Sequence, residues 1–568
     1  MRISKLVGER TKETPSGVFA KSHEYLLRAG YIKQVCNGVF SLLPPAMRVE
    51  KKITEIIRKE MDKFDGQEVL FPVLMPRELW DLSGRYTSIG NEMFRVKDRS
   101  GHDMVLGMTH EEAAVHMAKN TVKSYDQLPF MIYQIQTKLR DEPRARAGLI
   151  RVREFTMKDA YSFHDSKEDL EDYYQKMYVA YNNIFSRIGM KNFIAVESDS
   201  GMMGGKKTHE FMMITDIGED SLVLCEKGDY KANAEVAVSV LQKYESEETE
   251  NKEVDTGSKH TIEEICEFFN IKPYQTCKAV VYYGTVTQKY YLVFLRGDLV
   301  LNEVKLRNLV KEEVVPTDDL AGTSLVKGFI GPSNFKNENL VVLYDVSLKD
   351  ENNLVVGANK QNFHKTGFSF FRDIKVEQYH ELYEVKSGQY CPVCGNKINI
   401  VRGVEIGQIF QLGTKYTQSM GMSVHDKNGG EINPIMGCYG IGVGRAIACV
   451  AEESNDEKGL IWPLSIAPWQ VYIAPLKISD EKIKQESEQL YDLLNNSGFE
   501  TLIDDRDVSA GVKFADSELM GIPVRIVVSQ RNLENNQYEI TIRKTGERIM
   551  VEKQDLITRL NQIFKTLK

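Results

Sequence analysis

The sequence lacks the features that would place it outside the cell or in a membrane. Its eight cysteines are mostly isolated among 568 residues, which is typical of a reducing cytoplasm and not of a disulfide framework. No apolar run approaches the ~20 residues that a membrane span needs. The start, Met1–Leu6, lacks the apolar core of a secretory signal. We therefore expect a cytoplasmic protein without a membrane partner.

An excess of positive charge is also lacking. The net charge is −8, so the protein as a whole does not attract nucleic acid, and any contact with RNA must use a local basic patch. The length exceeds what one hydrophobic core can organise and indicates three or four domains. The acidic run Glu245–Glu253 indicates a solvated linker, after which a compact α/β unit is expected from about 256 to 385.

The most informative stretch is a basic hairpin. Residues Tyr133–Arg140 alternate between apolar and polar and predict a strand, a basic loop follows, and Leu149–Phe155 predict a second strand. Guanidinium groups on paired strands offer donor forks that match phosphate oxygens. Glu142 is expected on the same strand face as Arg140, where its carboxylate can take an amine proton. The pattern favours a nucleotide site, and the alternative is a solvated charged hairpin.

A short polar motif precedes the hairpin. His110 and His116 lie six residues apart, so the two histidines of a metalloprotease, at positions i and i+4, are excluded. Thr109 and Glu111 form either an N-terminal helix cap or a site for an ammonium group, whose natural partner is a carboxylate.

Two glycine-rich runs could approach a ligand. The glycines of Gly201–Phe211 indicate a loop close to a ligand or to backbone, but the run lacks the spacing of a phosphate loop. In Met436–Arg445 glycine recurs at every second place, which clears one strand face for a flat ligand. Arg445 then begins a helix, where it can stack on a purine or meet a terminal phosphate.

The central part of the chain predicts a separate α/β unit. Thr261–Phe269 is expected to be helical, and Ala279–Tyr283 and Tyr290–Leu295 are expected to be strands. Lys278 opens the first of these strands, where a solvated lysine is the simplest interpretation.

One pair of cysteines has metal-ligand spacing. Cys391 and Cys394 match one zinc knuckle, but a complete site needs a second pair. The candidate partner Cys225 has Gly228 where the second thiol would stand. We therefore expect a partial or lost site, with zinc unlikely.

The two ends of the chain predict further elements. Apolar residues within Val49–Phe64 recur at helical spacing, and Glu68–Pro76 predicts a buried strand that Pro72 interrupts. This pair is either a dimer edge or ordinary packing. From Pro468 onward, strands and a helix alternate as in a small βαβ domain with a partly parallel sheet.

In this order the segments resemble the class II aminoacyl-tRNA synthetases, most closely their bacterial prolyl branch. The N-terminal helix with Pro72 is similar to motif 1, Leu139–Glu142 with Arg151 to motif 2, and Gly440–Arg445 to motif 3. Thr109–Glu111 resembles the amino-acid loop, and Cys438–Gly442 matches the prolyl branch. The resemblance covers essentially the whole chain.

The resemblance implies an α/β (α+β) fold. Its parts are a six-stranded antiparallel catalytic sheet with helices, an inserted α/β editing domain and a C-terminal βαβ anticodon-binding domain. The implied borders are 1–223 and 401–467 for the catalytic core, 224–400 for the insertion with its linkers, and 468–568 for the last domain. The implied partners are ATP, Mg²⁺, L-proline, the tRNA for proline and a second copy in a homodimer.

The reaction implied by the resemblance is proline activation to prolyl-adenylate, transfer to the 3′ end of the tRNA, and removal of alanine from mischarged tRNA. The implied catalytic residues are Arg140 and Arg445. The implied ATP-binding residues are Arg140, Glu142, Arg151, Glu405, Gln408 and Arg445, with Mg²⁺ possible at Glu405. The implied proline-binding residues are Thr109, Glu111, Arg140, Phe410 and Cys438. The implied editing residues are Lys278, Gly331, Asp345 and His364, and the implied anticodon residues are Asp504, Arg506, Lys513 and Asp516.

Two alternatives remain open at this point. A threonyl-like synthetase shares motifs 2 and 3, but it builds a zinc site of cysteine and histidine ligands into its amino-acid site, where this chain has Thr109–Glu111. A non-catalytic tRNA-binding paralogue should have lost Arg140, Glu142 or Arg445, and all three are present.

Overall fold

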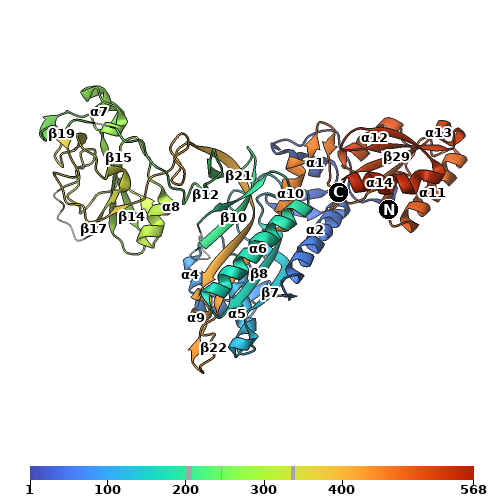
Figure 1. Ribbon diagram of the computed structural model, residues 1–568, viewed down its shortest axis with the longest axis horizontal. Coiled ribbons are helices and arrows are strands. Elements are labelled where there is room, and N and C mark those ends of the chain that lie inside the picture. Colours follow the sequence, from blue (N-terminus) through green and yellow to red (C-terminus); the bar gives the residue numbers. More distant parts are fainter. Residues whose placement is uncertain (200–206, 245, 334, 336–338, 568) are drawn as a thin grey trace. The chain divides into compact units, whose positions relative to one another are not determined.

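The computed structural model describes residues 1–199, 207–244, 246–333, 335 and 339–567 (Figure 1). The chain folds into two compact units. The first unit comprises Met1–Ala195, Ser200–Ile217 and Gly403–Lys568, and the second comprises Val196–Asp199 and Gly218–Arg402. Every helix in the described part of the chain is too short or too polar to cross a membrane.

A large sheet organises the first unit. Six of its strands lie in the order β10-β21-β24-β8-β7-β3. They are antiparallel except for β3, which runs parallel to β7. Their bounds are β3 (Gly66–Glu68), β7 (Phe130–Leu139), β8 (Glu154–His164), β10 (Lys207–Ile214), β21 (Ile398–Gly413) and β24 (Ile435–Gly442). The predicted fold class, with its antiparallel catalytic sheet, is confirmed.

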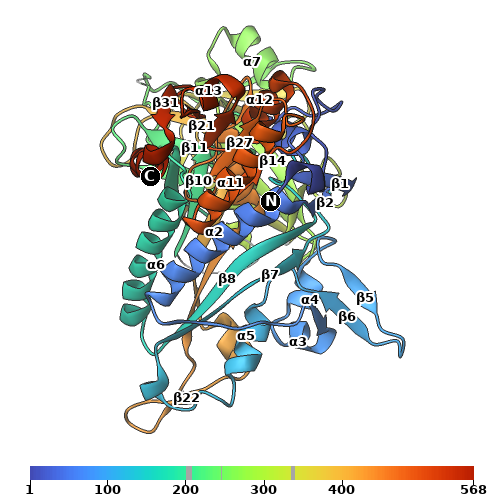
Figure 2. The ribbon, with the colours of Figure 1, turned by 90° about the vertical axis from the view of Figure 1, so that its right-hand side faces the viewer.

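Three helices cover one face of this sheet. They are α2 (Pro44–Asp62), α6 (Lys167–Arg187) and α10 (Val443–Glu453). Figure 2 shows α2 and α6 beside each other across β7 and β8. Apolar residues at helical spacing bury one stripe of α2, as its sequence predicts, although the helix begins earlier, at Pro44, because proline suits a first turn. Tyr439 and Ile441 of β24 point into this core.

A second apolar cluster lies on the opposite face of the sheet. It contains Met436 and Cys438 of β24, which alternate with the residues of the first core, as strand geometry requires. The elements gathered around it are β4 (Leu74–Pro76), α3 (Arg77–Leu82), α4 (Arg85–Ser88), β5 (Arg95–Lys97), β6 (Asp103–Leu106), α5 (Glu111–Ala118) and α9 (Lys415–Ser419).

The predicted strand Glu68–Pro76 is wrong as a single element. Its two ends belong to different sheets, β3 in the large sheet and β4 in a three-stranded sheet with β5 and β6. Pro72 lies between them, and a proline cannot donate to a ladder of strand hydrogen bonds.

The C-terminal part of the first unit contains a five-stranded sheet. Its order is β28-β27-β29-β30-β31, parallel from β28 to β29 and antiparallel beyond it. The predicted βαβ domain with a partly parallel sheet is confirmed. The elements are β27 (Val471–Pro475), α11 (Glu481–Asn496), β28 (Thr501–Ile503), α12 (Ala510–Leu519), β29 (Val524–Val528), α13 (Gln530–Glu534), β30 (Gln537–Ile542), β31 (Arg548–Glu552) and α14 (Leu556–Leu567).

The second unit contains a five-stranded sheet, β16-β14-β15-β17-β20, and a three-stranded sheet, β13-β19-β18. The helix and two strands expected there are confirmed, and the side chain of Thr261 caps the helix. Its strands include β11 (Asp220–Cys225), β12 (Lys231–Asn233), β13 (Lys252–Asp255), β14 (Cys277–Gly284), β15 (Tyr290–Arg296), β16 (Val314–Pro316), β17 (Leu340–Asp345), β18 (Leu354–Gly357), β19 (Phe363–Phe368) and β20 (Tyr379–His380). Its helices are α7 (Ile262–Phe269) and α8 (Glu303–Val310).

Shorter elements complete the first unit. They are α1 (Lys21–Arg28), β1 (Ile32–Cys36), β2 (Val39–Leu42), β9 (Phe193–Glu197), β22 (Val424–His425), β23 (Glu431–Ile432), β25 (Asn455–Asp456) and β26 (Gly459–Leu460), with β9 continuing into the second unit.

Candidate active site

Glu111 is the centre of a buried polar cluster at the start of α5. The hydroxyl of Thr109 donates to its carboxylate over 2.6 Å, and the thiol of Cys438 donates to the other oxygen over 3.4 Å. Arg85 donates to Glu111 over 3.0 Å. The helix cap proposed for Thr109 is wrong, because His110 is the capping residue and the Thr109 hydroxyl is bonded to a carboxylate instead. Two further predicted proline-binding residues, Thr109 and Cys438, therefore contact Glu111.

The carboxylates of this cluster share their neighbouring cations. Two buried carboxylates, Glu111 and Glu112, share the single buried guanidinium of Arg85. Burial raises the pKa of Glu112, and the charge of Glu111 raises it further, whereas Arg85 lowers it. Lys415 lies within electrostatic range of the same carboxylates, and burial lowers its pKa. The cluster thus places the buried carboxylate of Glu111 where it can accept from a small cationic amine.

Arg85 and Glu112 also belong to this cluster, and neither is among the site residues predicted from the sequence. Arg85 lies 26 residues before Glu111, in a short helix whose pattern carries no signal of a site. Glu112 follows Glu111 directly in the sequence, so the two carboxylates could be expected near each other. That both pair with Arg85 could not be predicted from the sequence.

The hairpin between β7 and β8 presents the predicted nucleotide-binding residues from a loop. Strand β7 ends at Leu139 and β8 begins at Glu154, so the second strand predicted from Leu149 is wrong in its start. Glu142 does not share a strand face with Arg140, because its backbone N–H bonds back to the Arg140 carbonyl over 2.8 Å. The fixed φ of Pro143 and its missing N–H oppose a continued strand pair.

The charged groups of this loop are held in place by hydrogen bonds. Arg140 donates from Nε to the Met108 carbonyl over 3.3 Å. Glu142 meets Arg151 at 2.9 Å and accepts from the Arg144 backbone N–H at 2.9 Å. Burial opposes the charge of Glu142, but these hydrogen bonds lower its pKa below the usual value. The carboxylate is therefore ionised and oriented.

Arg445 at the start of α10 links the loop to β21. Its guanidinium donates to the Ile150 carbonyl over 2.9 Å, and to the carbonyl and carboxylate of Glu405 over 2.9 and 3.1 Å. Burial lowers the pKa of Arg140, Glu405 raises it, and Arg445 lowers it, so these three charged groups lie within electrostatic range of one another.

A β-bulge sets the direction of Glu405. The pairing of β10 with β21 skips one residue of β21 between Glu405 and Gly407. Val404, Ile406 and Ile409 belong to the helix-covered core, whereas Phe410 belongs to the opposite cluster. Without the bulge, strand alternation would place the Glu405 side chain on the same face as Gly407 and Ile409. The extra residue moves the Glu405 side chain to the opposite face, which carries Gln408 and Phe410.

Two glycines of β24, Gly440 and Gly442, lie on this same face of the sheet. Gly440 pairs with Gln408, and Cys438 pairs with Phe410. A Cβ at Gly440 would meet its nearest neighbour at 3.6 Å, so that strand face is clear, as predicted. On the other face, a Cβ at Gly437 would lie 2.1 Å from the Tyr439 hydroxyl, so this glycine serves packing.

A buried network lies beneath the predicted site residues. Asp159 of β8 meets Lys138 at 2.7 Å and accepts from Tyr161 and Gln134 over 2.8 and 3.0 Å. Burial lowers the pKa of neighbouring His110 to about 4, so its imidazole is neutral. The strand alternation that orients Arg140 carried a signal for Lys138, but the pairing of Lys138 with Asp159 required the sheet.

The four predicted editing residues lie in the second unit in two groups. Lys278 lines a cleft of about 520 Å³ together with Asn302 and Glu303, and burial lowers its pKa. Asp345 ends β17 on the same sheet, where it accepts from the backbone N–H groups of Ser347 and Leu382. Burial raises the pKa of Asp345.

The other two editing residues meet at β18. A Cβ at Gly331 would lie 1.8 Å from the Gly357 carbonyl, and Gly357 is the strand partner of His364. His364 bonds through Nδ1 to the Thr256 hydroxyl over 2.7 Å, and burial lowers its pKa to about 4. The structure thus brings Gly331 and His364 to the same residue, Gly357, and it places Lys278 and Asp345 two strands apart on the larger sheet.

The four predicted anticodon residues form one internal network. Arg506 donates to Asp504 over 2.8 Å and to Asp516 over 2.7 Å, and Lys513 donates to the Asp504 carbonyl over 2.9 Å. Asp504 and Lys513 are buried, whereas Arg506 is half-buried.

Two other predictions remain. Cys391 and Cys394 lie near Cys225 in the second unit. Of the predicted loop Gly201–Phe211, residues 201–206 lie outside the described residues, and the prediction is wrong for Lys207–Phe211, which belong to β10.

Two families match the chain. The family described as tRNA synthetase class II core domain (G, H, P, S and T) matches residues 94–454, and the family described as anticodon binding domain matches residues 470–563.

Curated relatives match over the full length. A proline--tRNA ligase of Dehalococcoides mccartyi is 42% identical over 100% of this chain and 99% of its own. One of Geobacillus thermodenitrificans is 43% identical over 98% of both chains. Among solved structures, prolyl-tRNA synthetase from Cryptosporidium parvum, complexed with L-proline and AMP, aligns with a TM-score of 0.59 at 14% identity, covering 99% of this chain and 79% of that one. The likeness to that structure concerns the fold.

Proposed function

Because the chain belongs to the proline--tRNA ligases, which are built on the class II synthetase core, we propose how its own residues carry out that reaction. The chain activates L-proline with ATP and transfers it to tRNA. In the first step a carboxylate oxygen of proline attacks the α-phosphorus of ATP, and the bond to pyrophosphate breaks. In the second, a ribose hydroxyl at the tRNA 3′ end attacks the prolyl carbonyl, and AMP leaves.

The residue assignment rests on one observation. The Glu111 cluster contacts, through the thiol of Cys438, the face of β24 that also carries Gly440. Glu111 and Thr109 would hold the protonated nitrogen of proline, since a buried carboxylate with a hydroxyl beside it is a natural partner for a small cationic amine. Phe410 and Cys438, paired across neighbouring strands, would contact the apolar ring.

The arginines on the adjoining loop supply the charge that phosphoryl chemistry requires. Arg140 would hold the α-phosphate, where negative charge develops, and Arg151 and Arg445 would meet the tail phosphates. Glu142 would accept from the adenine amine. Hydrogen bonds that Arg140 and Arg445 donate to the carbonyls of Met108, Ile150 and Glu405 support these assignments, because they fix the guanidinium groups before substrate arrives.

A magnesium ion fits the donor set around Glu405. Glu405 has a second carboxylate oxygen besides the one bonded to Arg445, and the amide of Gln408 shares the face. Oxygen donors of this kind are the ligands that Mg²⁺ prefers, and the ion neutralises phosphate charge. Glu405 and Gln408 would hold it.

Proline-dependent exchange of pyrophosphate into ATP tests the assignment. We expect exchange with proline and not with threonine, which separates this reaction from a threonyl-like one. Arg140→Ala should lower the exchange rate about 10²–10³-fold, the scale for one preorganised donor. Arg144→Ala, an exposed residue of the same loop, is the matched control and should leave exchange unchanged. Equal rates in the two variants would refute the role of Arg140.

The second unit is proposed to hydrolyse alanyl-tRNA for proline. Proline and alanine are both small, so contacts to the amino acid alone discriminate poorly. The cleft beside Lys278, where burial lowers the amine pKa, supports a site there, with Asp345, Gly331 and His364 as the further residues. Lys278→Ala should slow deacylation, whereas Lys289→Ala, exposed in the turn that follows β14, should not. Equal deacylation by Lys278→Ala and the parent would sink this role.

We further propose a homodimer. Leu70 is 69% exposed and Leu74 is 49% exposed, directly after the helix and strand that resemble motif 1. Large exposed apolar side chains grouped on one segment mark interaction surfaces. Sedimentation should give a dimer for the parent and for Val286→Asp, an exposed residue of the second unit, and a monomer for Leu70→Asp.

Three organisational features belong to the same proposal. The catalytic core spans 1–223 and 401–467, the editing domain 224–400, and the anticodon-binding domain 468–568. In the last domain, Asp504, Lys513 and Asp516 would orient Arg506 toward anticodon bases. The eight thiols are unpaired in disulfides, which supports a cytoplasmic place of action.

A further inference from the structure

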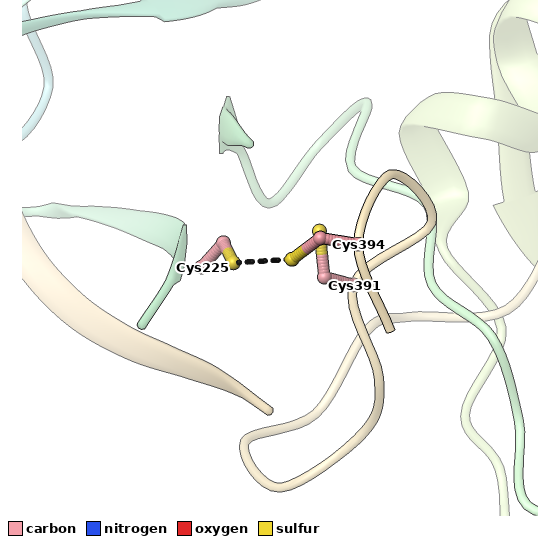
Figure 3. A group of neighbouring side chains, drawn as sticks. All are labelled: Cys225, Cys391 and Cys394. Carbon is pink, nitrogen blue, oxygen red and sulfur yellow. Dashed lines mark hydrogen bonds between the residues drawn. The ribbon is translucent and has the colours of Figure 1, made fainter. Parts of the chain in front are cut away.

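Three cysteine thiols of the second unit face one another. Cys225 ends β11, and Cys391 and Cys394 lie in the loop before β21. Their sulfur atoms all lie within 4.8 Å of one another, and those of Cys225 and Cys394 are 3.4 Å apart (Figure 3). The chain passes Cys225 shortly after it enters this unit and Cys391 shortly before it leaves.

Each group of thiols is carried by a tight turn. The N–H of Cys391 donates to the Asn396 carbonyl over 2.7 Å, and the N–H of Cys225 donates to the Tyr230 carbonyl over 2.9 Å, so both turns close across the same number of residues. The N–H of Glu226 donates to the Lys397 carbonyl over 3.2 Å and ties the turns together. Two tied turns hold the three sulfurs in place without a ligand.

The sulfurs also receive hydrogen bonds. The backbone N–H of Val393 donates to the Cys391 sulfur over 3.4 Å, and the side-chain amide of Asn396 donates to the Cys394 sulfur over 3.2 Å. Donors of this kind stabilise a thiolate and orient it as a ligand. A packed apolar cysteine has no need of them.

The spacing of the sulfurs suits a tetrahedral metal ion. Zinc binds thiolate sulfur at about 2.3 Å, which places two sulfurs of one tetrahedron roughly 3.8 Å apart. The separation of the Cys225 and Cys394 sulfurs, 3.4 Å, is close to that value, and all three sulfurs lie within 4.8 Å of one another.

The fourth corner of the tetrahedron falls to a ligand from outside the chain. Gly228 stands where the second thiol of the first turn would be, and a Cβ there would meet nothing within 4 Å. Open space at that position admits water. We propose that Cys225, Cys391 and Cys394 bind one Zn²⁺ ion, with water as the fourth ligand, and that the ion clamps the two ends of the second unit together. The missing thiol, which made zinc unlikely from the sequence alone, leaves three ligands that the fold has already assembled.

The full-length chain, purified under reducing conditions without oxygen and stripped with a chelator, tests the site with Co²⁺ and Zn²⁺. We expect one Co²⁺ per chain, with a sulfur-to-cobalt charge-transfer band and the visible bands of a tetrahedral ion, both removed by Zn²⁺. Cys394→Ser should weaken binding at least tenfold, and it is the least buried of the three. Cys266→Ser, a half-buried cysteine in α7 of the same unit, is the matched control and should bind as the parent does.

Zinc should also stabilise the parent. An ion that binds only the folded chain raises its unfolding temperature as free metal rises above the dissociation constant, and this shift should vanish in Cys394→Ser. The proposal is overturned if the parent binds no Co²⁺, if Cys394→Ser binds it as tightly as the parent, or if mass analysis of the oxygen-free protein shows a disulfide between Cys225 and Cys394. None of these results depends on aminoacylation.

Discussion

Replacing Glu111 with glutamine tests whether the buried carboxylate recognises the substrate nitrogen. Gln keeps the size and the hydrogen bond to Thr109, but it removes the charge that would face a protonated imino group. A hydrogen bond to a charged group contributes about 1.5–3 kcal/mol. Its loss should raise the KM for proline about 10- to 150-fold, at 1.4 kcal/mol for each factor of ten.

The neighbouring carboxylate offers a matched control. Glu112→Gln is the same chemical change, one residue further along, and it also takes one of the two carboxylates from Arg85. Both carboxylates accept from Arg85, but Glu112 also accepts from Ser83, whereas Glu111 also accepts from Thr109 and Cys438. Only the first variant should change the KM for proline strongly, and the KM for ATP should change in neither.

Pyrophosphate exchange at varied proline and ATP concentrations measures both constants, and thermal unfolding checks that each variant is folded. Arg85 keeps one carboxylate in either variant, and the repulsion between Glu111 and Glu112 is relieved, so we expect little loss of stability. Equal KM values for proline in the two variants would refute the assignment of Glu111. They would show that the total charge of the cluster, and not this one carboxylate, recognises the substrate.

Three further predictions follow from buried charges. Burial opposes the charge of Glu312, but hydrogen bonds from Thr287 and Tyr291 lower its pKa to about 2. The stability that this carboxylate contributes is therefore present above about pH 4.5 and is lost as the pH falls toward 2. Calorimetry across this range should show that Glu312→Gln loses less stability with falling pH than the parent does. Lys138→Met leaves Asp159 buried without its cation and should lower the free energy of unfolding in urea by about 3–5 kcal/mol. Adding Asp159→Asn should restore much of this loss. An unchanged unfolding midpoint in the single variant would contradict the ion pair. Arg506→Met should abolish aminoacylation of tRNA while preserving pyrophosphate exchange, which does not need tRNA; loss of both activities would point to general unfolding instead.

Local patterns were sufficient for the main elements. Apolar residues that recur every 2 or every 3.6 positions can be recognised from nearby residues alone. The sequence therefore predicted α2, β7, the strands of the second unit and the alternation of strands and helix in the last domain. Errors arose where local and tertiary signals differ. Glu68–Pro76 has an apolar run typical of one buried strand, yet its two ends pair with different sheets.

The candidate site was predicted residue by residue through a family resemblance, and the roles of its residues stay predictions. The sequence determined by itself that a basic loop, a Thr-His-Glu motif and a glycine-alternating strand occur in this order. It could not determine that Glu111 meets Cys438, 327 residues away, because that contact exists only once β24 pairs with β8.

The tertiary structure alone decided which charges share a partner and which side chains a strand presents. Arg85 joins two carboxylates from a helix without any local signal, and one bulge in β21 directs Glu405 toward Arg445. Pro72 and the glycines indicate where regular secondary structure is interrupted. They do not predict which side chains pack against those positions. The physical reason is that periodicity depends on adjacent residues, whereas a bond between distant groups depends on the register of every strand that lies between them.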